Sequence, residues 1–283
     1  MQRHERRRGA VLLGFFVAFG LLWVQPVPPV RAQEAAQASA APQLSDVEIE
    51  KFLTDAKVVR TRNVGKGVTN SLRATLSDGT ITHDAHVQIV DESRTTGPSS
   101  RGTELNFRDS WMFNVAAYRI DRLIGLKLVP VSVERKHGLK SAAFTWWVDD
   151  VIMDEGERLK KDIQPPSPQL WNESMQLIRL FDQLIYNVDR NMGNLVITKD
   201  WRVWAIDHTR AFRLHRTLAK GTNVTRCDRG VLEGLKKLDK QTLQDSVGKY
   251  LTNWERDALL SRRDEIVKLL EKSGDSALFD RKQ

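Results

Sequence analysis

Cysteine is the scarcest reactive side chain in this sequence, because Cys227 stands alone among 283 residues. A single cysteine excludes an internal disulfide framework, and no Cys and His residues have the spacing of zinc ligands. Cys227 is interpreted as a passive thiol, so the stability of the fold must come from a hydrophobic core. The composition, 41% hydrophobic and 28% charged, suits a globular protein with one large domain or two lobes.

Long hydrophobic runs are also missing. A membrane-spanning helix needs roughly 20 apolar residues, whereas the apolar stretch near the N-terminus covers only residues 10–24. Arginines precede this stretch, prolines follow it, and Val30-Arg31-Ala32 offers a small-residue cleavage site. This pattern predicts a signal peptide over residues 1–32 and export to a periplasm or a secretory pathway. The alternative is an uncleaved membrane anchor through residues 10–24.

Clusters of Lys and Arg interleaved with aromatic residues are not found, although the formal net charge is +8. Much of that charge comes from the predicted signal peptide, which holds Arg3, Arg6, Arg7, Arg8 and Arg31. The remaining chain is only mildly basic, which argues against a nucleic-acid partner. Residues 33–44, rich in Ala and Gln, are expected to form a flexible linker.

The sequence does contain one concentrated polar stretch, residues 187–212. It places Asp189, Asn194 and Asp207 within nineteen positions, separated by two short apolar runs. These runs predict a β-hairpin with a tight turn at Lys199-Asp200. Because a hairpin holds its flanking loops against each other, the three oxygen-bearing side chains are expected to converge. Carboxylate and amide oxygens hold Mg²⁺ on nucleotide phosphates in phosphoryl transfer, although Asp and Asn also populate ordinary turns.

The sequence motifs of this stretch resemble those of a known superfamily. Asp189-Arg190-Asn191-Met192-Gly193-Asn194 has the Asp-x4-Asn spacing of a kinase catalytic loop. Together with Ile206-Asp207-x4-Phe212, it is similar to the atypical kinases: phosphatidylinositol 3/4-kinases, bacterial HipA-type kinases and secreted Fam20 kinases. In those proteins Asp-Arg-His-x-x-Asn precedes Ile-Asp-x4-Phe, so Asn191 replaces the usual His. Residues 115–130 resemble the αC helix and the following strand of the same families.

The resemblance implies an α+β, two-lobed protein-kinase-like fold with a β-rich N-lobe over residues 45–153 and an α-rich C-lobe over residues 154–283. It implies ATP and Mg²⁺ as cofactors. Asp189 would then orient and deprotonate an acceptor hydroxyl. Asn194 and Asp207 would hold the metal. The phosphate acceptor, or any protein partner, is not identified by the sequence.

The local patterns add boundaries to this fold. A capping box at Ser45 and Glu48 predicts a helix through Ala56. A helix over residues 111–124 is expected to be capped by Asp109-Ser110 and ended by Gly125. Residues 95–102 are predicted to be a mobile loop, and residues 154–169 the hinge between the lobes. These elements sum to five strands and one αC-like helix in the N-lobe.

The expected nucleotide-binding residues depart from the kinase pattern. Alignment of the strand at residues 86–90 places Gln88 where kinases have Lys. Asn114 likewise stands where they have the αC Glu. A neutral amide pair would then replace an ion pair, and another cation would have to meet the phosphates. The remaining predicted nucleotide-binding residues are a possible glycine loop, which could also be a plain turn, and a nearby arginine: Gly65, Lys66, Gly67 and Arg73.

Three functions stay open on the sequence alone. The first is an exported Mg-ATP-dependent phosphotransferase. The second is a pseudokinase that binds nucleotide or activates a partner. The third is a non-catalytic envelope protein that matches the motif by chance. If the protein is active, Lys66 or Arg73 is expected to point toward Asp207, with Gln88 close to Asn114.

Overall fold

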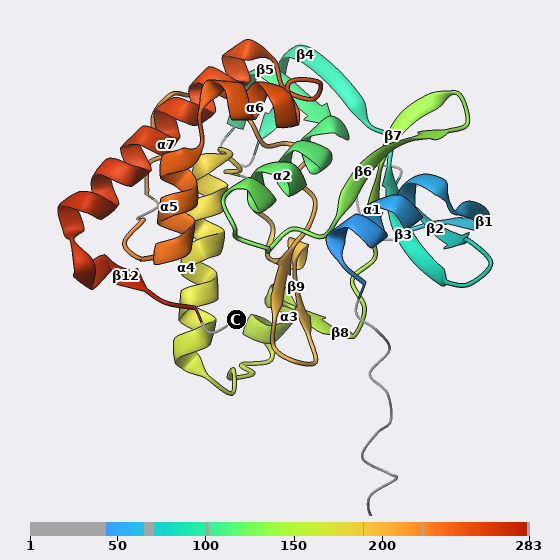
Figure 1. The fold of residues 1–283 in the computed structure, drawn as a ribbon, viewed down its shortest axis with the longest axis horizontal. Helices are drawn as coiled ribbons and strands as arrows, with labels where there is room; N and C mark the ends of the chain where they lie inside the picture. The colour runs from blue at the N-terminus through green and yellow to red at the C-terminus, as the bar shows by residue number, and fades with distance from the viewer. Residues whose placement is uncertain (1–43, 65–70, 100–101, 189, 222–223, 282–283) are drawn as a thin grey trace, which may run out of the picture. The chain divides into compact units, whose positions relative to one another are not determined.

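The computed structural model describes residues 44–64, 71–99, 102–188, 190–221 and 224–281 (Figure 1). Its N-terminal half is built on an antiparallel five-stranded sheet with the order β1-β2-β3-β7-β6. The predicted count of five strands is met by this sheet, but a separate β4–β5 hairpin adds two strands to the N-lobe. The strands are β1 (Lys57–Asn63), β2 (Leu72–Ser77), β3 (Thr82–Gln88), β6 (Ser132–His137) and β7 (Lys140–Trp146).

The two faces of this sheet differ in character. One face carries the buried residues Ala74, Val87 and Phe144, and it lies under helix α1 (Asp46–Asp55), whose Phe52 packs edge-on against Trp146 at 5.7 Å. Residues on a strand alternate between faces. The opposite face therefore carries the polar residues of β2 and β3: Arg73, Thr75, Asp84, His86 and Gln88.

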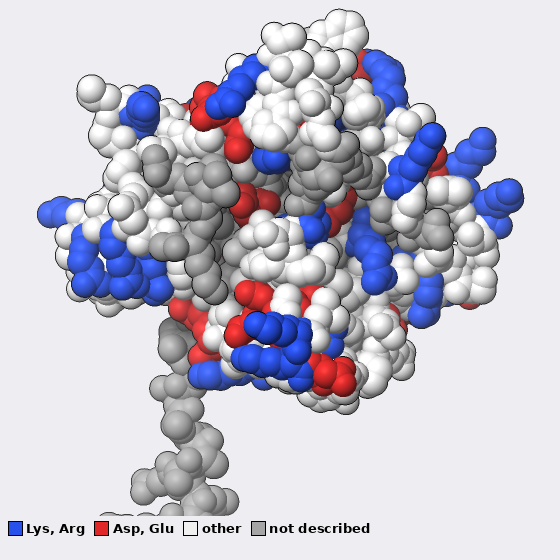
Figure 2. All heavy atoms as spheres, turned by 180° about the vertical axis from the view of Figure 1, so that it is seen from behind, with Lys and Arg blue, Asp and Glu red and all other residues white. Residues whose placement is uncertain are grey.

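Strand β1 forms one edge of the sheet, and all of its residues are exposed. Figure 2 shows Lys and Arg side chains gathered on the side of the molecule where β1 lies. Charged side chains on an edge strand discourage pairing with a second chain. This edge is therefore protected by Lys57, Arg60 and Arg62.

The helix boundaries follow the sequence closely. The Ser45–Glu48 capping box is present at the start of α1, as predicted. Helix α2 (Met112–Leu123) is the predicted αC-like helix, and Gly125 follows it with φ +72°. The predicted cap is seen only in part: Ser110 Oγ accepts from the Met112 N–H at 3.3 Å, but Trp111 occupies the N-cap without a side-chain hydrogen bond to the helix. Asp109 turns toward Thr209 of the C-lobe instead.

Residues 95–102 were predicted to form a mobile loop, and that prediction is wrong. Residues 95–99 and Gly102 lie in a hairpin of β4 (Asp91–Ser99) and β5 (Gly102–Ser110), which forms a sheet of its own. All nine β4 residues are polar, Gly or Pro, so periodicity gives no strand signal. The hairpin connects β3 to α2 along the chain.

The C-terminal half begins with β8 (Val151–Asp154), which pairs with β9 (Leu195–Thr198); β9 in turn pairs with β10 (Val203–Ala205). The β9–β10 hairpin turns at Lys199-Asp200, as the sequence predicted. Helices then dominate: α3 (Glu155–Lys160), α4 (Pro168–Leu184), α5 (Arg229–Lys237), α6 (Lys240–Val247) and α7 (Asn253–Ser273). A short parallel pair, β11 (Cys227–Asp228) and β12 (Leu278–Phe279), completes this half.

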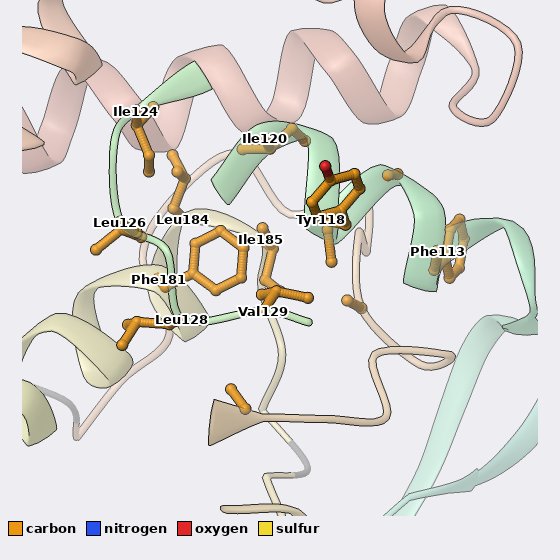
Figure 3. Close-up of a cluster of buried hydrophobic side chains, with 14 of the residues drawn as sticks. Phe113, Tyr118, Ile120, Ile124, Leu126, Leu128, Val129, Phe181, Leu184 and Ile185 are labelled. Atoms are coloured by element: carbon orange, nitrogen blue, oxygen red, sulfur yellow. The ribbon is translucent and has the colours of Figure 1, made fainter. Parts of the chain in front are cut away.

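A shared apolar core joins the two halves. Figure 3 shows Ile120 of α2 and Ile124, directly after that helix, close to Phe181 and Leu184 of α4 and to Ile185, which follows α4. All five side chains are buried. The β9–β10 hairpin is fixed to the same core by a hydrogen bond from Ala205 N–H to Leu128 O, 2.9 Å long. The polar ends of that hairpin are therefore held on a rigid base.

None of the helices within the described ranges combines the length and apolarity needed to cross a bilayer.

Candidate active site

The structure brings Asn194 and Asp207 together at one end of the β9–β10 hairpin. Asn194 closes a short 3-10 turn, Met192–Asn194, directly before β9, and Asp207 follows β10. The Asn194 Nδ2 amide lies 3.5 Å from Asp207 Oδ2, and the Ile206 N–H donates to Asn194 O at 2.9 Å. The hairpin register thus produces the convergence expected from the sequence.

Asp189, the predicted catalytic residue, lies outside the described residues. Its neighbour Arg190 is firmly placed, because its Nη2 lies 2.8 Å from Asp182 Oδ1 and its Nη1 donates to Ile206 O at 2.7 Å. Arg190 therefore ties the loop that carries Asp189 to α4 and to the residue before Asp207. Both partners of the Arg190–Asp182 pair are largely buried, which supports a structural role for this arginine.

Asp207 adopts an uncommon backbone conformation, with φ +56°. A non-glycine residue in the left-handed region is held there by its surroundings and is often found at a functional site. Its Oδ1 accepts a hydrogen bond from the Thr209 hydroxyl at 3.1 Å. The carboxylate is therefore oriented both by its own turn and by the adjacent Asn194 amide.

Asp109 is a candidate site residue that sequence reasoning assigned to a helix cap. It is 9% exposed, and its Oδ1 has no hydrogen-bond partner in the part of the chain that is described. Burial raises the pKa of its carboxyl; the Thr209 hydroxyl opposes this, and the charge of Asp207 adds to it. The carboxylates of Asp109 and Asp207 lie within electrostatic reach of each other, and Asp109 has one unpaired buried oxygen. A bound cation would stabilise both negative charges.

The available donors fit a hard divalent cation held partly by a nucleotide. Across the described ranges, no three His, Cys, Asp or Glu side chains gather into a complete metal cage. Mg²⁺ commonly takes only one or two carboxylates from the protein and completes its shell with phosphate oxygens and water. Asp207, Asp109 and the Asn194 amide oxygen suit that role. Their assignment as metal ligands remains a prediction.

Arg73 does not take the position expected of a phosphate-binding cation. Its Nη2 lies 2.5 Å from Asp84 Oδ2 on β3, and its guanidinium carbon lies 4.0 Å from the centroid of the Trp147 ring. The ion pair and the ring contact together hold this side chain against the sheet and Trp147. The other predicted cation, Lys66, lies outside the described residues, as do Gly65 and Gly67.

The expected Gln88–Asn114 pair is not seen between these two described side chains. Gln88 is 1% exposed; its amide donates to Ser71 Oγ at 3.3 Å and accepts from the Ile89 and Val90 N–H groups. Asn114 Oδ1 accepts instead from the backbone N–H of His208 at 2.7 Å. The αC-like helix therefore contacts the residue after Asp207, a link that the alignment did not predict.

Two histidines beside Asp207 were not assigned to this part of the site by the sequence analysis. His86 shares the cleft-side face of β3 with Gln88, and burial lowers its pKa while the charge of Asp207 opposes that shift. His208 is 1% exposed, and burial keeps its pKa well below the ordinary value. Both rings are therefore neutral near pH 7. Only the strand alternation of β3 could have indicated His86, and His208 follows Asp207 directly.

A cavity of about 820 Å³ lies in the C-lobe beside the loop of Asp189. Val188, Arg190 and Met192 contribute to its lining, as do Trp171 and Arg179 of α4. Its volume falls within the roughly 300–1,000 Å³ range of small-molecule sites. The position of this cavity is suitable for a group that approaches the catalytic loop from the C-lobe.

Comparison with solved structures identifies the fold. A hydra Fam20 structure, determined with sugar, matches 84% of this chain and 94% of its own length at 17% identity, with a TM-score of 0.61. A Golgi casein kinase with Mn/ADP bound matches 82% of this chain and 76% of its own length at 13% identity, with a TM-score of 0.55.

The fold is that of the atypical, Fam20-like kinases. The two-lobed kinase architecture expected from the sequence is thereby confirmed. A family-model scan and a search of curated proteins each returned no match. In this Fam20-like fold, the Asn194–Asp207 end of the hairpin faces the polar side of the N-lobe sheet, as the effect of Asp207 on His86 shows.

Proposed function

We propose that this Fam20-like chain transfers a phosphoryl group from Mg- or Mn-bound ATP to a hydroxyl acceptor. The observation that carries the proposal is the convergence of Asn194 and Asp207, with the unpaired buried oxygen of Asp109 nearby. The fold match to a kinase solved with Mn/ADP supports a divalent metal and a nucleotide as the cofactors.

The residues of the chain suggest which groups would hold the metal-nucleotide and which would act on the acceptor. Asp207 and Asp109 would hold the cation, and the Asn194 amide oxygen would assist, since its Nδ2 already points to Asp207. When bound, the cation would neutralise phosphate charge. Asp189 would accept the proton of the acceptor hydroxyl as its oxygen attacks. The cavity beside Val188 and Arg190 would admit the acceptor.

A nucleotide-binding pseudokinase is the second candidate, and one observation favours it. The polar face of the N-lobe sheet lacks a lysine at the expected position: β3 carries Gln88 there, and Arg73 is paired with Asp84. Without that lysine, the metal would supply more of the charge neutralisation at the phosphates. Slow or absent turnover with intact Mg-nucleotide binding would follow.

Calorimetry and a turnover assay on residues 33–283 separate these functions. Binding of Mg-ATP with phosphoryl transfer supports the kinase, and binding without transfer supports the pseudokinase. The absence of any binding would contradict both and favour a non-catalytic role.

We propose further that the protein is exported. The support is the basic start, the short apolar run and the small-residue site at Val30-Arg31-Ala32, which together are typical of a signal peptide. N-terminal sequencing of protein from the native host tests this. We expect a mature start at Gln33, whereas an intact Met1 in the membrane fraction would indicate an anchor through residues 10–24.

A further inference from the structure

One largely buried carboxylate from the β4–β5 hairpin reaches the segment that follows Asp207. Glu104 of β5 is 12% exposed at its side chain and pairs with Arg213 through two parallel contacts, the second of which is 2.8 Å long. The same carboxylate accepts from Arg210 at 3.1 Å. Glu104 thus lies between two guanidinium groups that are only three residues apart.

Each arginine also donates to a backbone oxygen: Arg213 to one within the segment, and Arg210 to one in the hairpin. Arg213 Nη1 donates to Arg210 O at 2.6 Å, and Arg210 Nη2 donates to Pro98 O of β4 at 2.6 Å. The Arg210 guanidinium lies 4.6 Å from the ring centroid of Phe107. The hairpin and the segment of residues 207–213 are therefore joined by charge, hydrogen bonds and an aromatic contact.

The C-lobe supports the same segment from its other side. Arg262 of α7 is fully buried and donates to Arg213 O at 3.2 Å, to His215 O, and to Leu184 O at 2.8 Å. Burial lowers the pKa of Arg262 to about 9, so the group stays charged at neutral pH. The segment is thus held between a carboxylate from the N-lobe hairpin and a cation from the C-lobe.

This segment needs external support because its backbone is strained at both ends. Asp207 has φ +56° and Phe212 has φ +59°, and a non-glycine residue keeps such a conformation only where its surroundings fix it. A second tie lies near the start of the segment, where the Ser110 N–H donates to Thr209 O at 2.9 Å. Strand β5 therefore holds the segment at Thr209 and, through Glu104, at Arg210 and Arg213.

We propose that Glu104 is a built-in anion that orders the 207–213 segment and thereby positions Asp207 for the metal. In many switchable proteins, arginines that follow a functional loop are ordered by an added phosphate. Here a carboxylate of the chain itself is already bound by two arginines, so the segment is held without modification. Glu104 is a positioning residue, and this role rests on the proposed metal-nucleotide function of Asp207.

Variants of the full chain test the proposal. Glu104→Ala removes the carboxylate of β5 from both guanidinium groups, so the segment should loosen. We expect Mn-ADP to bind about 10- to 100-fold more weakly, the range typical of residues that orient metal ligands. Backbone hydrogen exchange of residues 207–215 should rise in parallel. Glu104→Gln keeps the shape without the charge and should show a smaller loss, which also covers the case in which Glu104→Ala fails to fold.

Chemical rescue separates positioning from general stability. Formate should enter the space left by Glu104→Ala and restore part of the Mn-ADP affinity, with no effect on wild type. Glu233→Ala is the matched control, because Glu233 forms an exposed pair with Lys236 on α5; it should leave affinity and exchange unchanged.

The proposal is overturned if folded Glu104→Ala keeps both wild-type Mn-ADP affinity and wild-type exchange at residues 207–215. If wild type itself binds no Mn-ADP, the proposed function fails. The exchange measurement then decides whether Glu104 orders the 207–213 segment, and unchanged exchange in Glu104→Ala would overturn that role.

Discussion

The two sides of the cleft have different chemistry. On the C-lobe side, Asn194 and Asp207 meet with side-chain atoms that remain available to a ligand. On the N-lobe side, the polar groups bind each other: Arg73 pairs with Asp84, and Gln88 binds Ser71 and its own strand. The proposed metal ligands are therefore open to a ligand, whereas Gln88 is neutral and Arg73 is already paired.

This difference assigns the neutralisation of phosphate charge to the metal. In kinases a strand lysine and metal ions share that task. Among the described residues proposed to face the nucleotide, the carboxylates of Asp207 and Asp109 would attract the metal ion most strongly. Nucleotide binding should then depend on divalent metal more completely than in a kinase with an intact lysine, and changes on the C-lobe side should matter most.

Removal of Asp207 should have the largest effect. We expect Asp207→Ala to weaken Mg-nucleotide binding by more than about 100-fold, because loss of a direct ligand should exceed the 10- to 100-fold cost of disturbing its supports. The fold should persist. The measurement is a thermal shift with and without Mg-ATP. Asp245→Ala, an exposed change on α6, is the control, and an unchanged shift in Asp207→Ala would remove Asp207 from the site.

Restoring the kinase lysine and glutamate on the N-lobe side should increase nucleotide affinity and turnover only slightly. In the double variant Gln88→Lys, Asn114→Glu, the N–H groups of Ile89 and Val90 lose the amide oxygen of Gln88. We expect the free energy of unfolding to fall by about 1–3 kcal/mol, the usual cost of unpaired buried polar groups. Mg-ATP affinity should change by less than about threefold. A tenfold gain in affinity or turnover would instead indicate a degenerate kinase that lacks only its lysine.

Arg73 offers a smaller test of the same contrast. Arg73→Ala removes the ion pair with Asp84 and the contact with Trp147, so we expect a stability loss of about 1 kcal/mol in urea unfolding. Because the side chain is already paired, nucleotide affinity should change by less than about twofold. Arg60→Ala, on the exposed β1 edge, serves as the control. A large affinity loss in Arg73→Ala would place this arginine on the phosphates after all.

Cys227 should show the smallest effect at ordinary pH. Burial raises the pKa of its thiol to about 12, so the thiolate fraction at pH 8 is about 1 in 10,000. A thiol-specific dye should label the folded protein only as fast as it unfolds. Because the unfolded thiol ionises near pH 8.5 while the folded one does not, stability should decline as pH rises above that value. Rapid labelling at pH 8 would contradict the buried placement.

The sequence predicted the parts of this molecule whose signals are local. The Ser45 capping box, the α2 helix with its Gly125 stop and the Lys199-Asp200 turn each depend on a few adjacent residues, and each is confirmed. The convergence of Asn194 and Asp207 was predictable for the same reason, because one hairpin carries both.

Contacts between distant segments could not be predicted in this way. Asp109 looked like a helix cap because it directly precedes α2, yet its neighbour is Thr209, a hundred positions away along the chain. Asn114 was matched to Gln88 by alignment, but its oxygen accepts from His208. The β4–β5 hairpin lacks apolar alternation, so its sequence offered no reason to expect it. Its contact with the C-lobe, such as that of Glu104 with Arg213, is seen only in the folded structure.

The most direct test of the metal-centred account is a calorimetric titration of ADP into residues 33–283 with Mn²⁺ and with a chelator. The Golgi casein kinase fold neighbour was solved with this metal-nucleotide pair. We expect saturable binding with Mn²⁺ and no measurable binding with the chelator, because Asp207 and Asp109 can meet the phosphates only through a cation. Equal ADP affinity in the two titrations would contradict the account.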